Sequence, residues 1–229
     1  MNFRAVLFDL DGTLLNTLDD LADAANFALR RLGFPEHPAE SYKYFIGDGI
    51  ENLVRRAVPE GQCDAATIDR CLSLIRDQYA GHWADKTRPY EGIAVLLDAL
   101  TARATPMAVL SNKPEEFTRL CVERLLPRWR FEAVVGACAS LPRKPDPAGA
   151  LQIAQRLQLW PGEIVYLGDT ATDMQTAVSA GMFPVGALWG FRTADELLAH
   201  GAQMLIREPR ELLPLLDIGP SGSTRPSGD

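Results

Sequence analysis

The sequence is poor in cysteine and has no pair of cysteines at the spacing that metal or redox sites use. Its 229 residues include 4 cysteines, Cys63, Cys71, Cys121 and Cys138, and no C-x-x-C motif. This pattern argues against zinc, iron–sulfur and thioredoxin-like chemistry. We interpret the cysteines as small buried hydrophobic residues, and we predict a reduced, cytoplasmic protein.

Long apolar runs and an excess of basic residues are also absent. No segment approaches the roughly 18 apolar residues that a membrane-spanning helix requires, and the first residues, MNFRAVLFDLDG, lack the pattern of a signal peptide. The 23 Lys and Arg residues against 30 Asp and Glu residues give a net charge of −7 without a basic cluster. We therefore expect neither a membrane nor a nucleic acid as a partner. An anionic small molecule is still compatible with this charge, because a pocket can gather positive groups.

The sequence does contain a repeated alternation of short apolar runs and amphipathic segments. With 47% apolar and 23% charged residues, its composition is that of a globular protein. The apolar runs indicate strands buried on both faces, at 4–10, 107–110, 133–135, 164–167 and 184–188. The segments between them indicate helices, at 93–103, 115–126, 147–159 and 171–180. This order predicts an α/β fold with a doubly wound parallel sheet.

One long segment departs from the alternation. Residues 16–87 show apolar side chains at helical spacing and no convincing buried strand. We predict a helical cap domain here, inserted into an α/β core formed by residues 1–15 and 88–218. Residues 219–229 are rich in Gly, Ser and Pro, and we expect them to form a disordered tail.

Acidic residues follow two of the predicted strands. Asp9 and Asp11 end the first apolar run, and Asp169 and Asp173 follow the run at 164–167. Taken singly, these residues are also explained as solvated loop acids or as capping residues at the start of a helix. The carboxyl ends of parallel strands meet at one edge of a sheet, so we expect the four carboxylates to lie close together. Such a group of oxygen ligands suits Mg²⁺.

Two further loops offer groups that bind anions. Ser111, Asn112 and Lys113 follow a predicted strand, where a hydroxyl and backbone amides at a helix start could hold an anion. Lys144 lies in the loop Arg143-Lys144-Pro145-Asp146-Pro147. A solvated lysine is the alternative interpretation of this loop, because a single K-P-D-P sequence is weak evidence.

Four motifs in this order resemble those of phosphatases of the haloacid dehalogenase superfamily. They are DLDGT, SNK, KPDP and GDTATD. The helical insert after the first motif, and the sequences YFIGDGIENLVRRA (44–57) and ALWGFRT (187–193), are similar to the phosphoglycolate-phosphatase-like branch. The resemblance extends from residue 5 to about residue 190. It implies a Rossmann-like core and a Mg²⁺-dependent phosphatase that acts on a small phosphate ester.

The resemblance also implies a role for each motif residue. Asp9 matches the nucleophile that forms an aspartyl-phosphate, and Asp11 matches the general acid and base. Mg²⁺ is expected on Asp9, on the backbone carbonyl of Asp11 and on Asp169, with Asp173 in its outer shell. Thr13 is expected to order the loop that carries Asp11.

Phosphate binding and substrate choice are assigned to other residues. Ser111, Asn112 and Lys144 match the groups that bind phosphoryl oxygens. Substrate choice is expected from the closing cap. The expected specificity residues are Gly47, Asp48, Arg55 and Lys113.

The substrate implied first is 2-phosphoglycolate. A sugar or amino-sugar phosphate is the alternative, and a sugar-phosphate mutase with the same motifs is a further one. From a different class, a receiver-type signalling module would share the acidic sheet edge, but receivers are shorter and lack the helical insert. The expected assembly is a monomer or a homodimer.

Overall fold

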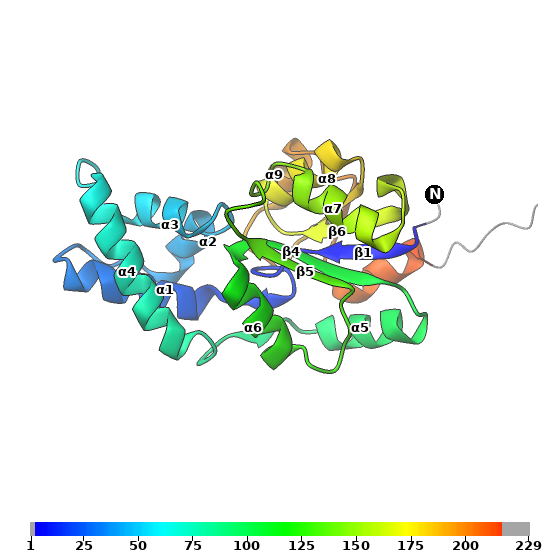
Figure 1. The fold of residues 1–229 in the computed structure, drawn as a ribbon, viewed down its shortest axis with the longest axis horizontal. Coiled ribbons are helices and arrows are strands. Elements are labelled where there is room, and N and C mark those ends of the chain that lie inside the picture. Colours follow the sequence, from blue (N-terminus) through cyan, green and yellow to red (C-terminus); the bar gives the residue numbers. More distant parts are fainter. Residues whose placement is uncertain (1–2, 217–229) are drawn as a thin grey trace, which may run out of the picture.

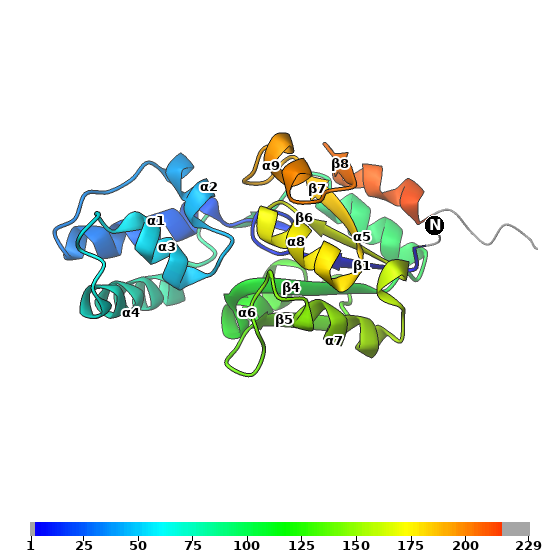
Figure 2. The same cartoon turned by 90° about the horizontal axis from the view of Figure 1, so that it is seen from above.

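A computed structural model describes residues 3–216, so the predicted tail and residues 217–218 of the predicted core lie outside the described residues. A parallel sheet of six strands, in the order β5-β4-β1-β6-β7-β8, forms the centre of the molecule (Figures 1 and 2). The strands are β1 (Ala5–Phe8), β4 (Met107–Pro114), β5 (Ala133–Ala137), β6 (Ile164–Gly168), β7 (Phe183–Ala187) and β8 (Met204–Ile206). The prediction of a parallel α/β sheet is confirmed.

Strand β1 shows why the apolar runs become central strands. Successive side chains of a strand point to opposite faces, and Ala5 and Leu7 pack in one hydrophobic cluster while Val6 and Phe8 pack in another. All four side chains are fully buried. The strand pairs with β4 on one side and β6 on the other, so its backbone groups are bonded inside the protein. A run without polar residues therefore fits this position.

Helices cover both faces of the sheet. One face carries α5 (Ile93–Ala102) and α6 (Glu115–Leu125), and the other carries α7 (Ala148–Leu157) and α8 (Ala171–Ala180) (Figure 1). The remaining elements of this part are α9 (Ala194–Ala199) and the 3-10 helices η2 (Pro161–Glu163) and η3 (Pro209–Leu215). The helices over these faces lie within two residues of their predicted bounds.

Between β1 and α5 the chain forms a separate group of helices, which we call the helical segment (residues 18–82). Its elements are α1 (Leu18–Arg31), η1 (Ala39–Ser41), α2 (Tyr42–Phe45), α3 (Ile50–Ala57) and α4 (Ala65–His82). Their apolar side chains form a hydrophobic cluster of their own, which Phe117 and Phe191 join from the other part of the molecule. The segment lies beyond the carboxyl ends of the strands (Figure 1). The domain boundaries given above stay a prediction.

Two short strands connect the helical segment to the sheet. They are β2 (Leu15–Asn16) and β3 (Arg88–Pro89), which pair antiparallel. Asp20 of α1 is buried beside them and accepts hydrogen bonds from the backbone N–H (2.8 Å) and the hydroxyl (2.6 Å) of Thr87. The carboxylate of Asp20 thus connects α1, at the start of the helical segment, to Thr87, which follows the end of that segment.

The four cysteines differ in their exposure. Cys71 and Cys121 are buried as predicted, but Cys63 is partly exposed and Cys138 is exposed, because Cys138 lies in the loop after β5. The interpretation of all the cysteines as buried residues was therefore wrong. Within residues 3–216, no helix combines the length and the apolar character needed to cross a membrane.

Candidate active site

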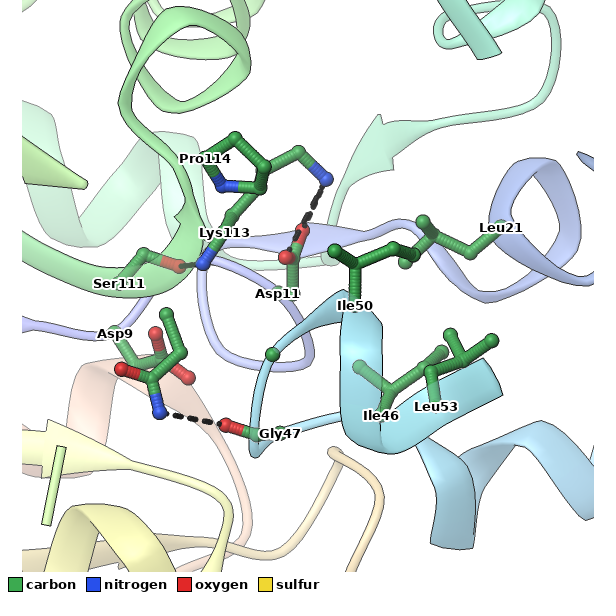
Figure 3. A pocket seen from close by; sticks show the side chains of 12 residues that line it. Asp9, Asp11, Leu21, Ile46, Gly47, Ile50, Leu53, Ser111, Lys113 and Pro114 are labelled. Carbon is green, nitrogen blue, oxygen red and sulfur yellow. Dashed lines mark hydrogen bonds and ion pairs between the residues drawn. The ribbon is translucent and has the colours of Figure 1, made fainter. Parts of the chain in front are cut away.

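A small cavity lies where the helical segment meets the carboxyl ends of the strands. Its volume is about 40 Å³, and Figure 3 shows how the side chains surround it. The sheet side contributes Asp9, Asp11, Ser111, Asn112, Lys113 and Pro114, and the helical segment contributes Leu21, Ile46, Gly47, Gly49, Ile50 and Leu53. Motifs that are about 100 residues apart in the sequence thus meet each other and the loop of Gly47 and Gly49 in the helical segment.

Lys144 lies between two of the predicted acidic residues. Its ammonium group is 2.8 Å from Oδ1 of Asp9 and 2.7 Å from Oδ1 of Asp173, and all three side chains are buried. Burial and the charge of Asp173 raise the pKa of Asp9 well above its ordinary value, although Lys144 acts in the opposite direction. Lys144 is therefore not a solvated lysine, and it neutralises part of the negative charge of the site.

Asp169 is held at the end of β6 by its neighbours. Oδ1 accepts a 2.8 Å hydrogen bond from the Thr13 hydroxyl, and Oδ2 accepts one of 2.8 Å from the backbone N–H of Phe191. A Cβ atom on Gly12 or Gly190 would lie 2.2 Å from atoms of Asp169, so only glycine fits on either side of it. Burial and the charge of Asp173 raise the pKa of Asp169 to about 7.

Asp173 has a structural and an electrostatic role together. It forms a capping box with Thr170 at the start of α8, where its Oδ2 accepts hydrogen bonds from the backbone N–H (3.0 Å) and the hydroxyl (2.6 Å) of Thr170. Its Oδ1 accepts hydrogen bonds from Lys144 (2.7 Å) and the Tyr166 hydroxyl (3.3 Å). The helix cap therefore fixes the acid beside the Lys144 ammonium group.

The carboxylates of Asp9, Asp169 and Asp173 form one group that could hold a metal ion. Each offers an oxygen within 4.8 Å of the others. Oδ1 of Asp9 forms a buried ion pair with the Lys144 ammonium group at 2.8 Å. Several buried carboxylates with one ammonium group among them carry an excess of negative charge, and oxygen donors suit a divalent cation. The residues present therefore fit the predicted metal.

The side chain of Asp11 points away from this group and towards Lys113 (Figure 3). The Lys113 ammonium group lies 3.1 Å from Oδ1 and 3.4 Å from Oδ2 of Asp11, and it donates a 2.8 Å hydrogen bond to the Tyr79 hydroxyl. Burial alone would lower the pKa of Lys113, but the charge of Asp11 outweighs it and raises that pKa above its ordinary value. Lys113, an expected specificity residue, thus lies inside the site.

Ser111 and Asn112 were both predicted to bind phosphate, and their side chains make different contacts. The Ser111 hydroxyl lines the cavity and accepts a 3.2 Å hydrogen bond from the backbone N–H of Lys113. The Asn112 amide donates to the backbone carbonyls of Gly47 (3.1 Å) and Lys144 (3.0 Å), and it accepts from the Lys144 N–H (2.9 Å). Both N–H donors of the Asn112 side chain are used in these bonds, so the side chain positions two loops instead of offering a donor to an anion.

The loop that contains Gly47 and Asp48 contacts α8 through Asp48. Its carboxylate accepts a 2.5 Å hydrogen bond from the Thr172 hydroxyl of α8 and forms an ion pair with Arg56. Burial raises the pKa of Asp48, but the bonds from Thr172 and Arg56 outweigh this effect, so the pKa is lowered overall. Gly47 and Asp48 therefore lie at the contact between the helical segment and the sheet.

Arg55, like Asp48, is an expected specificity residue that does not line the cavity. It lies on the exposed side of α3 and pairs with Glu51 one turn away, at 2.7 Å. A different arginine, Arg192, connects the two parts of the molecule, since its guanidinium donates to the backbone carbonyls of Lys43 and Ile46 (2.9 Å to Ile46). Arg192 belongs to the ALWGFRT sequence, but nothing in that sequence indicated the contact.

Comparison with known proteins gives a consistent result. The family model of the haloacid dehalogenase-like hydrolases matches residues 6–187. Phosphoglycolate phosphatase of Chromobacterium violaceum is 33% identical over 221 residues, which cover 95% of this chain and 98% of that protein. Phosphoglycolate phosphatase of Xylella fastidiosa is 34% identical over 219 residues, with coverage of 95% and 94%.

A solved structure extends the similarity to three dimensions. The crystal structure of a predicted phosphoglycolate phosphatase from Haemophilus somnus matches with a TM-score of 0.86 at 27% sequence identity. The match covers 94% of this chain and 98% of that chain. Because so much of the chain is covered, the similarity includes both the sheet and the helical segment.

Proposed function

This chain belongs to the haloacid dehalogenase-like hydrolases, and we propose that it is a Mg²⁺-dependent phosphatase that hydrolyses 2-phosphoglycolate through an aspartyl-phosphate on Asp9. The position of Asp9 carries the proposal. Asp9 follows β1, lines the cavity, is paired with the Lys144 ammonium group, and belongs to the group of buried carboxylates. A nucleophilic carboxylate needs positive charge beside it to approach a phosphate dianion.

The proposed reaction has two steps. A carboxylate oxygen of Asp9 attacks phosphorus, the bond from phosphorus to the ester oxygen breaks, and Asp11 gives its proton to the departing alkoxide. Asp11 then takes a proton from a water molecule, which attacks the phosphorus of the aspartyl-phosphate. Inorganic phosphate leaves, and the carboxylate of Asp9 is restored. Both side chains line the same cavity, as this sequence of steps requires.

The other residues of the site stabilise charge during both steps. Asp9, Asp169 and the backbone carbonyl of Asp11 would hold Mg²⁺, with Asp173 in its outer shell, and the ion would neutralise charge on the phosphoryl oxygens. Lys144 supplies a positive charge and Ser111 a hydroxyl donor for those oxygens. Thr13 and Thr170 fix the carboxylates through the hydrogen bonds described above.

The walls of the cavity favour a small substrate. Leu21, Ile46, Ile50 and Leu53 offer no polar atom to the leaving group, and the volume is about 40 Å³. A sugar would place several hydroxyl groups against these side chains without partners, which is unfavourable. The names of the two relatives also support 2-phosphoglycolate. A cytoplasmic location and a monomeric or homodimeric state stay predictions.

Phosphate release from a panel of esters tests the proposal. The panel contains 2-phosphoglycolate, hexose phosphates, amino-sugar phosphates and nucleotides, each assayed with Mg²⁺ and with a chelator. We expect Mg²⁺-dependent release with 2-phosphoglycolate as the best substrate. Preference for a sugar phosphate would show that the chain is a phosphatase but that 2-phosphoglycolate is not its substrate. Transfer of the phosphoryl group without release would identify a mutase, and no turnover by the folded protein would contradict the proposal.

A further inference from the structure

Lys113 is a buried cation that has no role in the two proposed reaction steps. Among the described residues that line the cavity, it is the only one with a positively charged side chain. Its side chain is 3% exposed, as is that of Lys144, which does not line the cavity and bridges Asp9 and Asp173. A buried ammonium group is costly unless its surroundings supply acceptors, so its presence on an otherwise largely apolar wall requires an explanation.

Lys113 makes three hydrogen bonds, two of them to the oxygens of one carboxylate, so a further acceptor would take the place of one of these two. Its contacts with Asp11, at 3.1 and 3.4 Å, are long compared with the roughly 2.7–2.9 Å of a strong charge-assisted bond. Its contact with the Tyr79 hydroxyl is short, at 2.8 Å. An ammonium group has three N–H donors. Lys113 is thus anchored by Tyr79 and only loosely bonded to Asp11.

We propose that Lys113 binds the carboxylate of the leaving group, and that Tyr79 positions the Lys113 ammonium group for this contact. The inference rests on the proposed function and adds the residue that distinguishes a phosphorylated small acid from a neutral ester of the same size. A carboxylate one carbon away from the ester oxygen would enter the cavity that Asp9, Asp11 and Lys113 line together. The remaining wall offers it no other cation.

The same site already contains an ammonium group shared between two acids. Lys144 contacts Asp9 at 2.8 Å and Asp173 at 2.7 Å. Lys113 would be shared in the same way between Asp11 and the substrate carboxylate. A neutral hydroxyl in place of that carboxylate forms a weaker bond with Lys113, because charge on both partners strengthens the bond.

Tyr79 makes this recognition depend on the helical segment. It lies on α4, its ring centroid is 4.8 Å from the Lys113 ammonium group, and it packs edge-on against Phe117 with a centroid distance of 5.1 Å. Phe117 belongs to α6, directly after the strand that carries Lys113. The ammonium group is therefore fixed from both parts of the molecule, and it has this position only while they are in contact.

The test compares two substrates that differ only in the group that meets Lys113. They are 2-phosphoglycolate and 2-hydroxyethyl phosphate, in which a neutral CH₂OH group replaces the carboxylate. The readout is the ratio of their kcat/KM values, because any effect of Lys113 on Asp11 acts on both substrates and cancels. We expect Lys113→Met to lower the ratio at least roughly tenfold. Tyr79→Phe should lower it less, mainly by raising KM for 2-phosphoglycolate.

Arg76 provides the matched control. It is an exposed cation on α4, one turn before Tyr79, and it does not line the active-site cavity. Arg76→Met should leave the ratio unchanged. If Lys113→Met fails to fold, Lys113→Arg and Tyr79→Phe decide the question by the same ratio, since both disturb the ammonium position.

The outcomes separate the inference from the function it rests on. If the Lys113 and Tyr79 variants lose activity equally on both substrates, Lys113 does not recognise the carboxylate, and the phosphatase proposal stands. If the wild-type protein does not distinguish the two esters, the inference is likewise wrong. If the wild-type protein releases phosphate from neither, the proposed function itself fails.

Discussion

The hydroxyl of Thr13 donates a 2.8 Å hydrogen bond to Oδ1 of Asp169, although 156 residues separate the two in the chain. The contact arises because β1 and β6 are neighbours in the sheet, so the loops after them meet. That Thr13 orders the loop of Asp11 stays a prediction, and its side chain also contacts an acid of the carboxylate group. A hydrogen bond that holds a metal-binding carboxylate in its orientation is a common means of raising metal affinity.

Removing this hydroxyl should therefore weaken metal binding. We expect Thr13→Val to raise the Mg²⁺ concentration needed for half-maximal activity roughly ten- to hundredfold. Thr13→Ser keeps the donor and should stay close to the wild-type value. The measurement is a Mg²⁺ titration of phosphate release at saturating substrate. Identical titrations for the Val and Ser variants would show that the bond does not support the metal site.

The hydrogen bond from Thr172 to Asp48 joins α8 to the helical segment. Thr172→Val removes the donor with little change in shape, and we expect a rise in KM of about fivefold, for a bond worth about 1 kcal/mol. The value of kcat should change less, because neither residue contacts the reacting atoms. A kinetic titration with 2-phosphoglycolate measures both constants. An unchanged KM would mean that substrate binding does not depend on this bond between α8 and the helical segment.

The carboxylate of Asp20 should be important for stability. It is buried and bonded to the backbone and hydroxyl of Thr87, so Asp20→Ala leaves a buried N–H without its partner. We expect a loss of about 2–4 kcal/mol in the free energy of unfolding. Asp23→Ala is the control, since Asp23 forms an exposed ion pair with Lys86 and should cost less than about 1 kcal/mol. Urea unfolding of both variants checks the difference.

The raised pKa of Asp169, about 7 against an ordinary value of 3.8, predicts how pH affects the metal-free protein. Between these two values the folded state holds a proton that the unfolded chain has released. The contribution of Asp169 to the free energy of unfolding is therefore greatest near the lower value and falls as the pH rises towards the higher one.

Thermal unfolding in a chelating buffer measures this effect. We expect the Tm to fall by several degrees between about pH 5.5 and about pH 7.5. The fall should be smaller for Asp169→Asn, which has no proton to lose, and Mg²⁺ should stabilise the wild-type protein more at the higher pH. A fall of equal size in both proteins would contradict the assignment to Asp169.

The central sheet and the carboxylate group were predictable from the sequence for a physical reason. A strand buried on both faces requires a run without polar residues, and Asp9 and Asp169 stand directly after two such runs. β8 was not predicted, because it is a short edge strand in which only Ile206 is buried. The two-residue strands β2 and β3 also carry no periodic signal, and Pro89 in β3 argues against a strand.

Contacts between the two parts of the molecule were much harder to predict. Arg192 and Ile46 are 146 residues apart in the chain, and the sequence does not indicate that the Arg192 guanidinium donates a hydrogen bond to the Ile46 carbonyl. Tyr79 lies at a helical spacing that indicates burial, and the contact of its hydroxyl with Lys113 depends on how α4 packs against α6. Such contacts follow from the relative position of elements rather than from local pattern.

Detection of a phosphoryl group on Asp9 by mass spectrometry is the most direct test of the proposed mechanism. Asp11→Asn protein would be mixed with 4-nitrophenyl phosphate, whose leaving group needs no proton, quenched in acid, digested and examined by mass spectrometry. We predict that the peptide containing Asp9 gains the mass of one phosphoryl group, because the second step lacks its base. Asp9→Asn should gain none, release no phosphate and remain folded. Turnover by Asp9→Asn, or a phosphoryl group on another residue, would contradict the account.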